Sequence, residues 1–279
     1  MKIKLWGTRG SLASAGPDTV RYGGDTASVQ IVGCNGESVV LDAGSGIRAI
    51  GPELPAETAR VDVLLTHLHM DHIQGLGFFQ PLFDPTIEVR VWGPGSTTID
   101  LGRRLTRYLS PPLFPVLLRD LPNVTLHEID PPRTIMIGEL TIRADLITHP
   151  GPTLGFRIEC SDGALAYLPD HEPALGVMDF PDSPEWTSGF GLAVDADVLI
   201  HDAQYTGEEH KTRVGWGHST LEHALAFARL AGVKQLVTFH HDPAHSDEML
   251  DEVIADLVDN SKLPFVVTPG RAGLEIDLA

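Results

Sequence analysis

The chain has 279 residues, of which 42% are hydrophobic, and its formal net charge at pH 7 is −18. The acidic balance argues against a long nucleic acid as partner, because such binding depends on Lys and Arg side chains that displace phosphate counterions. No run approaches the roughly 18 consecutive apolar residues that span a bilayer, so a membrane partner is also excluded.

The first third of the chain has the pattern of short strands joined by glycine turns. Residues 1–6 form the first candidate strand. Two apolar runs, 27–34 and 38–41, flank Asn35-Gly36, which predicts a type I′ hairpin because both positions tolerate positive φ. The β-branched run 61–66 is typical of a buried strand, and it leads directly into a group of histidines.

The segment 99–122 differs from its surroundings. Helical spacing at 101–109 is followed by a proline-rich stretch that cannot continue a helix. We interpret the segment as an Arg/Pro-rich insertion in one domain that spans residues 1–279. It carries the only local concentration of positive charge, formed by Arg103, Arg104, Arg107 and Arg119.

Strands resume after the insertion and helices follow near the end of the chain. Further strands are predicted at 89–93, 125–129, 140–148, 156–159, 164–168 and 233–239. Ser219 and Glu222 have the spacing of a capping box, and Gly232 ends the helix that they begin. A second amphipathic helix is expected at 247–258. Strands with interspersed helices predict an α/β fold.

Residues 66–72 read THLHMDH and place three imidazoles and a carboxylate close together: His67, His69, Asp71 and His72. On an extended run, side chains two residues apart project to the same side. If a turn begins at Asp71, the last two side chains surround a second centre. One segment therefore supplies two ligands to each of two metal ions. Imidazole and carboxylate donors favour zinc, with manganese or iron as alternatives.

Other ligand-type side chains stand at the C-terminal ends of apolar strands. They are His149, Asp170 and His240. Strand ends converging on one edge of a sheet are where α/β folds place their sites. Together with the THLHMDH segment these residues complete two metal shells. His241 is an alternative to His240 as the last ligand.

These motifs, in this order, resemble the metallo-β-lactamase superfamily over nearly the whole chain. The resemblance implies a four-layer αββα sandwich with the metals at one edge. It assigns His67, His69 and His149 to the first metal and Asp71, His72 and His240 to the second. Asp170 would bridge the two metals. Asp42, in the sequence LDAGSG, would be a buried support rather than a ligand.

The details resemble the phosphodiesterase branch, which includes tRNA 3′-end endonucleases and phosphoribosyl cyclic phosphodiesterases. The similar features are GTRGS at 7–11, YGG at 22–24, GHST at 217–220 and an Asp rather than a Cys at position 170. The resemblance implies that His218 points at the scissile phosphate, and a helix N-terminus favours an anion there. His149 and Asp170 are 21 positions apart, which leaves no room for the basic arm of the tRNA enzymes.

The sequence therefore predicts a phosphodiesterase for a small anionic substrate, such as a cyclic nucleotide or cyclic sugar phosphate. Attack would come from a hydroxide that bridges two divalent ions, with Asp71 and His218 as catalytic residues. A lactone, β-lactam or thioester hydrolase is an alternative, and a non-catalytic binding protein is a second one. The roles of His201, Asp202 and the arginine cluster stay open.

The cellular location and the oligomeric state are predicted from few features of the sequence. Cys34 and Cys160 are the only cysteines, and we expect two buried thiols rather than a bridge. With no export pattern at the start of the chain, this predicts a cytoplasmic protein. A homodimer agrees with the resemblance.

Overall fold

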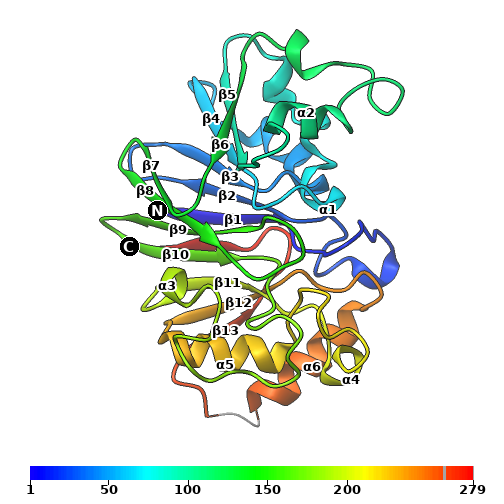
Figure 1. The fold of residues 1–279 in the computed structure, drawn as a ribbon, viewed down its shortest axis with the longest axis vertical. Coiled ribbons are helices and arrows are strands. Elements are labelled where there is room, and N and C mark those ends of the chain that lie inside the picture. The colour runs from blue at the N-terminus through cyan, green and yellow to red at the C-terminus, as the bar shows by residue number, and fades with distance from the viewer. Residues whose placement is uncertain (260–261, 279) are drawn as a thin grey trace.

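The computed structural model describes residues 1–259 and 262–278. Two seven-stranded sheets lie in the middle of the molecule (Figure 1). The first sheet has the order β14 (Glu275–Asp277), β1 (Lys2–Gly7), β2 (Ser28–Val32), β3 (Ser38–Leu41), β4 (Arg60–Leu64), β5 (Glu88–Pro94) and β6 (Val124–Ile129). The second has the order β13 (Val266–Pro269), β12 (Gln235–Phe239), β11 (Val198–Asp202), β10 (Gly163–Leu168), β9 (Leu154–Cys160), β8 (Leu140–Leu146) and β7 (Arg133–Ile137).

Helices cover the outer face of each sheet. The α-helices are α1 (Met70–Ile73), α2 (Leu101–Thr106), α3 (Phe190–Ala193), α4 (Gly207–His210), α5 (Leu221–Ala231) and α6 (Asp247–Asp259). Short 3-10 turns are η1 (Pro17–Thr19), η2 (Ser45–Ala49), η3 (Gly51–Glu53), η4 (Leu76–Phe78), η5 (Gln80–Phe83) and η6 (Leu118–Asp120). In Figure 1, α2 lies beyond the first sheet and α5 and α6 lie beyond the second. Each helix in the described residues is too short or too polar to cross a membrane.

Three apolar clusters hold these layers together. One lies between the sheets and includes Ile3, Leu41, Phe156 and Tyr167. A second packs α3, α5 and α6 on the second sheet, and a third packs α2 and the 3-10 turns on the first. Removal of this apolar surface from water is the main favourable term in folding. The predicted αββα sandwich is confirmed, and the shared core supports our proposal of a single domain.

The sheet topology gathers the functional side chains at one edge. Strands β3 to β6 run parallel, as do β10 to β13. Strand β8 has the same direction as β10, because each pairs antiparallel with β9. The C-terminal ends of these strands therefore face one way and lead into the segments that carry the predicted ligands.

Two local predictions were wrong. Asn35-Gly36 does not form a two-residue type I′ turn: only Gly36 has positive φ, and a bond from the Gly33 N–H to the Glu37 carbonyl closes a three-residue loop. Thr220, not Ser219, caps α5 by accepting the His223 N–H. The Ser219 hydroxyl instead donates to the His171 carbonyl at 2.6 Å.

Other differences concern boundaries and burial. The insertion helix is shorter than predicted, and β7, β13 and β14 were not predicted. Cys34 and Cys160 are free, as expected, but Cys34 is exposed and Cys160 only half-buried. Their Sγ atoms lie 3.5 Å apart, between the loop after β2 and the end of β9. The expectation of two buried thiols was therefore wrong.

A fully buried arginine joins the N-terminal loop to the segment that follows β12. The Arg9 guanidinium donates to the carbonyls of Gly23, Asp242 and His245 and lies 3.6 Å from the Asp247 carboxylate. Burial lowers the pKa of Arg9, and Asp247 opposes that shift. A buried charge is tolerated only when it is paired and hydrogen-bonded in this way.

Arg9→Met should destabilise the protein by about 3 kcal/mol, because it removes a buried charge that donates to three backbone carbonyls and faces the Asp247 carboxylate. The free energy of unfolding from chemical denaturation measures this. The control is Arg48→Met, since Arg48 is 60% exposed and makes a surface ion pair with Asp25. Equal stabilities of the two variants would contradict a structural role for Arg9.

Candidate metal centre

The first cluster of ligand atoms lies where β4, β8 and β10 end. It consists of His67, His69, His149 and Asp170, whose ligand atoms all lie within 4.8 Å of one another. The His149 Nε2 atom is 3.2 Å from His69 Nδ1, and His67 Nε2 is 3.7 Å from an Asp170 oxygen. All but His69 are buried.

The second cluster shares Asp170 and adds Asp71, His72 and His240, again within 4.8 Å. The His240 Nε2 atom lies 3.1 Å from Asp71 Oδ2 and 3.2 Å from Asp170 Oδ2. His72 Nε2 lies 2.9 Å from Asp170 Oδ1. Segment 66–72 thus divides its side chains between the two clusters, because α1 begins at Met70 and turns Asp71 and His72 away from His67 and His69. Metal binding by these side chains stays a prediction.

Hydrogen bonds on the outer ring nitrogens orient the imidazoles. His72 Nδ1 bonds Asp42 at 2.8 Å, His149 Nδ1 bonds the Gly217 carbonyl at 2.8 Å, and His240 Nδ1 bonds the Gln204 amide oxygen at 2.8 Å. A carbonyl or carboxylate can only accept, so each Nδ1 carries the proton. In the neutral imidazoles the Nε2 lone pairs are left facing the clusters.

Asp42 supports the ligand segment, as the resemblance implied, although its role in metal binding stays a prediction. Its fully buried carboxylate accepts from the Thr66 N–H, the Thr66 hydroxyl, His72 and the Tyr167 hydroxyl at 2.8 to 3.0 Å. Thr66 Oγ1 in turn lies 3.0 Å from His67 Nδ1. One carboxylate thereby orients histidines of both clusters.

The electrostatics of the clusters fit divalent cations. Burial opposes a proton on His72, but Asp170, Asp71 and Asp42 raise its pKa well above the usual range. Burial and neighbouring imidazoles lower the pKa of His67, whose Nε2 atom is buried without a hydrogen-bond partner. This nitrogen and the carboxylates of Asp71 and Asp170 converge on the clusters, where a cation at each centre would satisfy them together.

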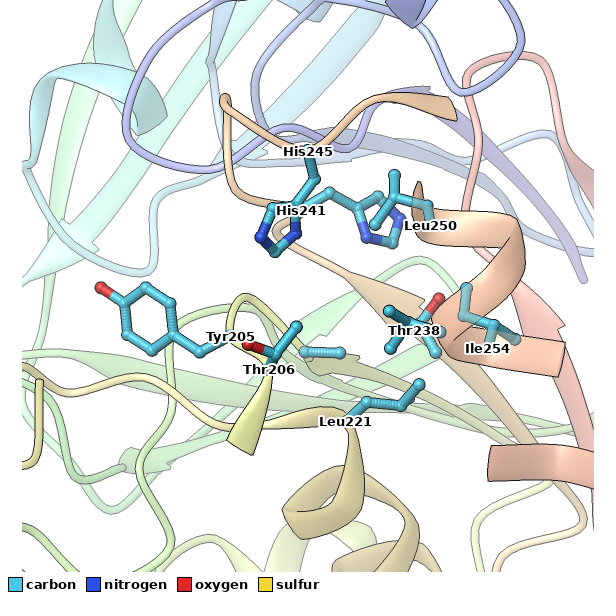
Figure 2. Close-up of a pocket in the computed structure, with 10 residues that line it drawn as sticks. Tyr205, Thr206, Leu221, Thr238, His241, His245, Leu250 and Ile254 are labelled. Atoms are coloured by element: carbon cyan, nitrogen blue, oxygen red, sulfur yellow. The ribbon is translucent and has the colours of Figure 1, made fainter. Parts of the chain in front are cut away.

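The structure brings His240, and not His241, into the second cluster. His241 Nε2 donates to the Gly270 carbonyl at 2.9 Å, and burial lowers the pKa of His241 to about 3. Figure 2 shows that His241 lines a small cavity together with His245, Thr238 and Leu250. This cavity measures about 20 Å³, which is enough for about one water molecule and too small for a substrate.

The GTRGS motif contributes through backbone contacts. The Ser11 N–H donates to Asp71 Oδ2 at 2.7 Å, and Gly10 packs against the His240 ring. A Cβ atom on Gly10 would lie 2.4 Å from His240 Nδ1. The motif therefore needs glycine at this position for a packing reason that the sequence pattern alone does not give.

His218 lies beside both clusters. Its Nδ1 atom is 2.7 Å from Asp202 Oδ2, and its ring centroid is 5.0 Å from those of His149 and His240. The backbone N–H groups of Ser219, Gln204 and His171 also donate to Asp202. Asp202 thus holds His218, which is about 9% exposed.

Two other buried residues, His201 and Glu172, do not orient a proposed ligand directly. His201 bonds His171 at 2.8 Å and its own neighbour's carbonyl, away from the clusters. Glu172 accepts the N–H groups of Gly176, Gly215 and Gly217 rather than a histidine. Sequence reasoning missed Gln204 and Tyr167, which no motif marks; their position one or two residues from a strand end was the only signal.

Two clusters of histidine and aspartate at the open edge of an αββα sandwich define a candidate divalent-metal centre. Residues 37–241 match the family model of the beta-lactamase superfamily domain, and the chain belongs to this superfamily. It is 26% identical over 265 residues to ribonuclease BN of Cronobacter sakazakii, covering 78% of this chain and 83% of that one.

Solved structures show the same fold. A diphosphatase from the PhnP family has a TM-score of 0.69 at 18% identity, covering 99% of this chain and 96% of the other. Zn²⁺-bound PqqB from Methylobacterium extorquens has a TM-score of 0.72 at 16% identity over all of both chains.

Gly10→Ala should displace His240 and remove metal from the second cluster while the first keeps its ion. Metal content per chain after zinc loading, by atomic emission, should fall to roughly half of the wild-type value. Gly16→Ala is the control, because a Cβ atom there meets nothing within 4 Å. Full metal content in Gly10→Ala would show that the His240 ring can move without loss of a ligand.

Proposed function

We propose that the protein is a metal-dependent phosphodiesterase for a small anionic substrate. The observation that carries the proposal is His218, held by Asp202 at 2.7 Å against the rings of His149 and His240. A buried carboxylate that fixes Nδ1 leaves the other ring nitrogen free for a substrate or a proton. The names of the similar proteins, a ribonuclease and a diphosphatase, support chemistry at phosphorus.

The ligand sets proposed for two divalent ions are His67, His69, His149 and Asp170, and Asp71, His72, Asp170 and His240. Zinc suits this mixture of imidazole and carboxylate best, with manganese or iron as alternatives. Bound ions would supply Lewis-acid activation of water and of the phosphate oxygens.

The chain's own residues have separate tasks in this proposal. The Ser11 N–H fixes the Asp71 carboxylate, which would orient the attacking water. His218 would either hold a phosphate oxygen or give a proton to the leaving oxygen, with Asp202 fixing the orientation of its ring. Arg9 and Gly10 act only by placing Asp71 and His240.

Loading with zinc or manganese should restore hydrolysis of bis-p-nitrophenyl phosphate, of thymidine 5′-(p-nitrophenyl phosphate) and of a 2′,3′-cyclic nucleotide to the chelated protein. Release of p-nitrophenolate from the first two substrates, formation of the nucleoside monophosphate from the third by chromatography, and metal content are measured together. Metal binding with faster turnover of a lactone or thioester than of these diesters would favour a carbon-centred hydrolase instead. Full metal content without turnover of either class would favour a binding protein.

His218→Ala should keep both metal ions and lower kcat for phosphodiesters by at least about 100-fold, as expected for loss of a positioned acid or charge-stabilising group. His127→Ala is the control, because His127 packs on Trp92 away from the clusters. Unchanged turnover with His218→Ala would rule out the proposed role.

A small substrate in the cytoplasm completes the proposal. The net charge of −18 and the short separation between His149 and Asp170 argue against a long RNA, although relatives include ribonucleases. A homodimer stays a prediction.

A further inference from the structure

An open cavity lies between the segment that carries the proposed ligands and the insertion. It measures about 480 Å³ and is lined by apolar and aromatic side chains and two arginines: Leu68, Met70, Ile73, Arg104, Arg107, Tyr108 and Leu113. A smaller cavity of about 190 Å³ is lined by the ligands His67 and His69 and shares Leu68 and Arg104 with the first. The larger cavity therefore adjoins a cavity that reaches two of the proposed metal ligands.

The structure separates the four insertion arginines. Arg103 pairs with Asp100, and Arg119 lies near Asp120; neither lines the cavity. Arg104 is held by Glu128 and the Pro94 carbonyl. Arg107 lines the cavity and is exposed, and within residues 1–259 and 262–278 its side chain has no hydrogen bond or ion pair.

The walls beside Arg107 are apolar and accessible. Met70 is 50% exposed and Leu113 is 68% exposed. The ring of Tyr108 is fixed because its hydroxyl donates to the Gln74 carbonyl at 2.6 Å. Exposed apolar side chains around a ring and an unpaired guanidinium form a site for a flat group that carries an anion.

We propose that this cavity binds the nucleoside of the substrate and that Arg107 binds a second phosphate on that nucleoside. The inference rests on the proposed phosphodiesterase function. In a chain of net charge −18, the metal centre and Arg107 are two separate cationic positions joined by an apolar surface. A nucleoside with a 5′-phosphodiester and a 3′-phosphate carries two anionic groups, one for each of these positions. A guanidinium group binds phosphate through paired N–H donors.

Two substrates that differ in one group test this inference: thymidine 5′-(p-nitrophenyl phosphate) with and without a 3′-phosphate. We expect the wild-type protein to prefer the 3′-phosphorylated substrate by roughly ten-fold in kcat/KM, as for a charge-assisted hydrogen bond. Arg107→Gln should abolish the preference and keep kcat/KM for the other substrate. Arg103→Gln, four residues earlier in the same insertion, should keep the preference.

Binding separates failure of this inference from failure of the proposed function. Calorimetry compares thymidine 3′,5′-bisphosphate with thymidine 5′-monophosphate on wild type and Arg107→Gln. Tighter binding of the bisphosphate that Arg107→Gln removes, without any diester hydrolysis, would keep the pocket and overturn the phosphodiesterase. Hydrolysis of both diesters at equal kcat/KM, or faster turnover of an alkyl p-nitrophenyl phosphate, would overturn the inference alone.

Discussion

The buried carboxylate of Asp42 is the interaction on which the site depends. It follows β3 in the first sheet and accepts hydrogen bonds from Thr66 and His72, and also from Tyr167 of the second sheet. A buried carboxylate is costly unless its lone pairs are satisfied, and here they are. Asp42 also has φ of 59°, a conformation that persists only where surrounding contacts enforce it. Hydrogen bonds to Asp42 therefore join the two sheets at the edge where the proposed metal ligands lie.

A second fixed point is the N-terminal loop, which Arg9 ties to the segment after β12. These contacts of Arg9 place Gly10 against His240 and the Ser11 N–H on Asp71. The N-terminal loop therefore supports two side chains of the second cluster. The first cluster has a different support, because Gly217 holds His149 and Glu172 holds the Gly217 N–H. Beyond the shared Asp42 and Asp170, each cluster therefore has a support that the other lacks.

Local patterns predicted the parts of the site that local geometry determines. The two-residue spacing of His67 and His69, and ligands after apolar strands, follow from strand geometry alone. Gln204, Tyr167 and the Asp202–His218 pair depend on contacts between distant segments, which no spacing records. The same reason explains why the predicted helix cap was wrong. Ser219 is a residue type that caps helices, but its hydroxyl donates to the carbonyl of the distant His171. Strands β7, β13 and β14 were missed because they lie at sheet edges, where most of their residues are exposed or only half-buried and give no continuous apolar run.

The structure also separates chemistry from substrate choice. The proposed ligands and their supports come from strand ends and the N-terminal loop, whereas the insertion contributes no ligand to either cluster. Of its four arginines, Arg103, Arg104 and Arg119 lie near carboxylates, whereas Arg107 meets none among the residues that the structure describes. A change in the insertion can therefore alter which substituent of a phosphodiester is bound, while the side chains of residues 67–72 keep their positions. Such a division explains how one superfamily site can act on different substrates, since function depends on groups added around a constant fold.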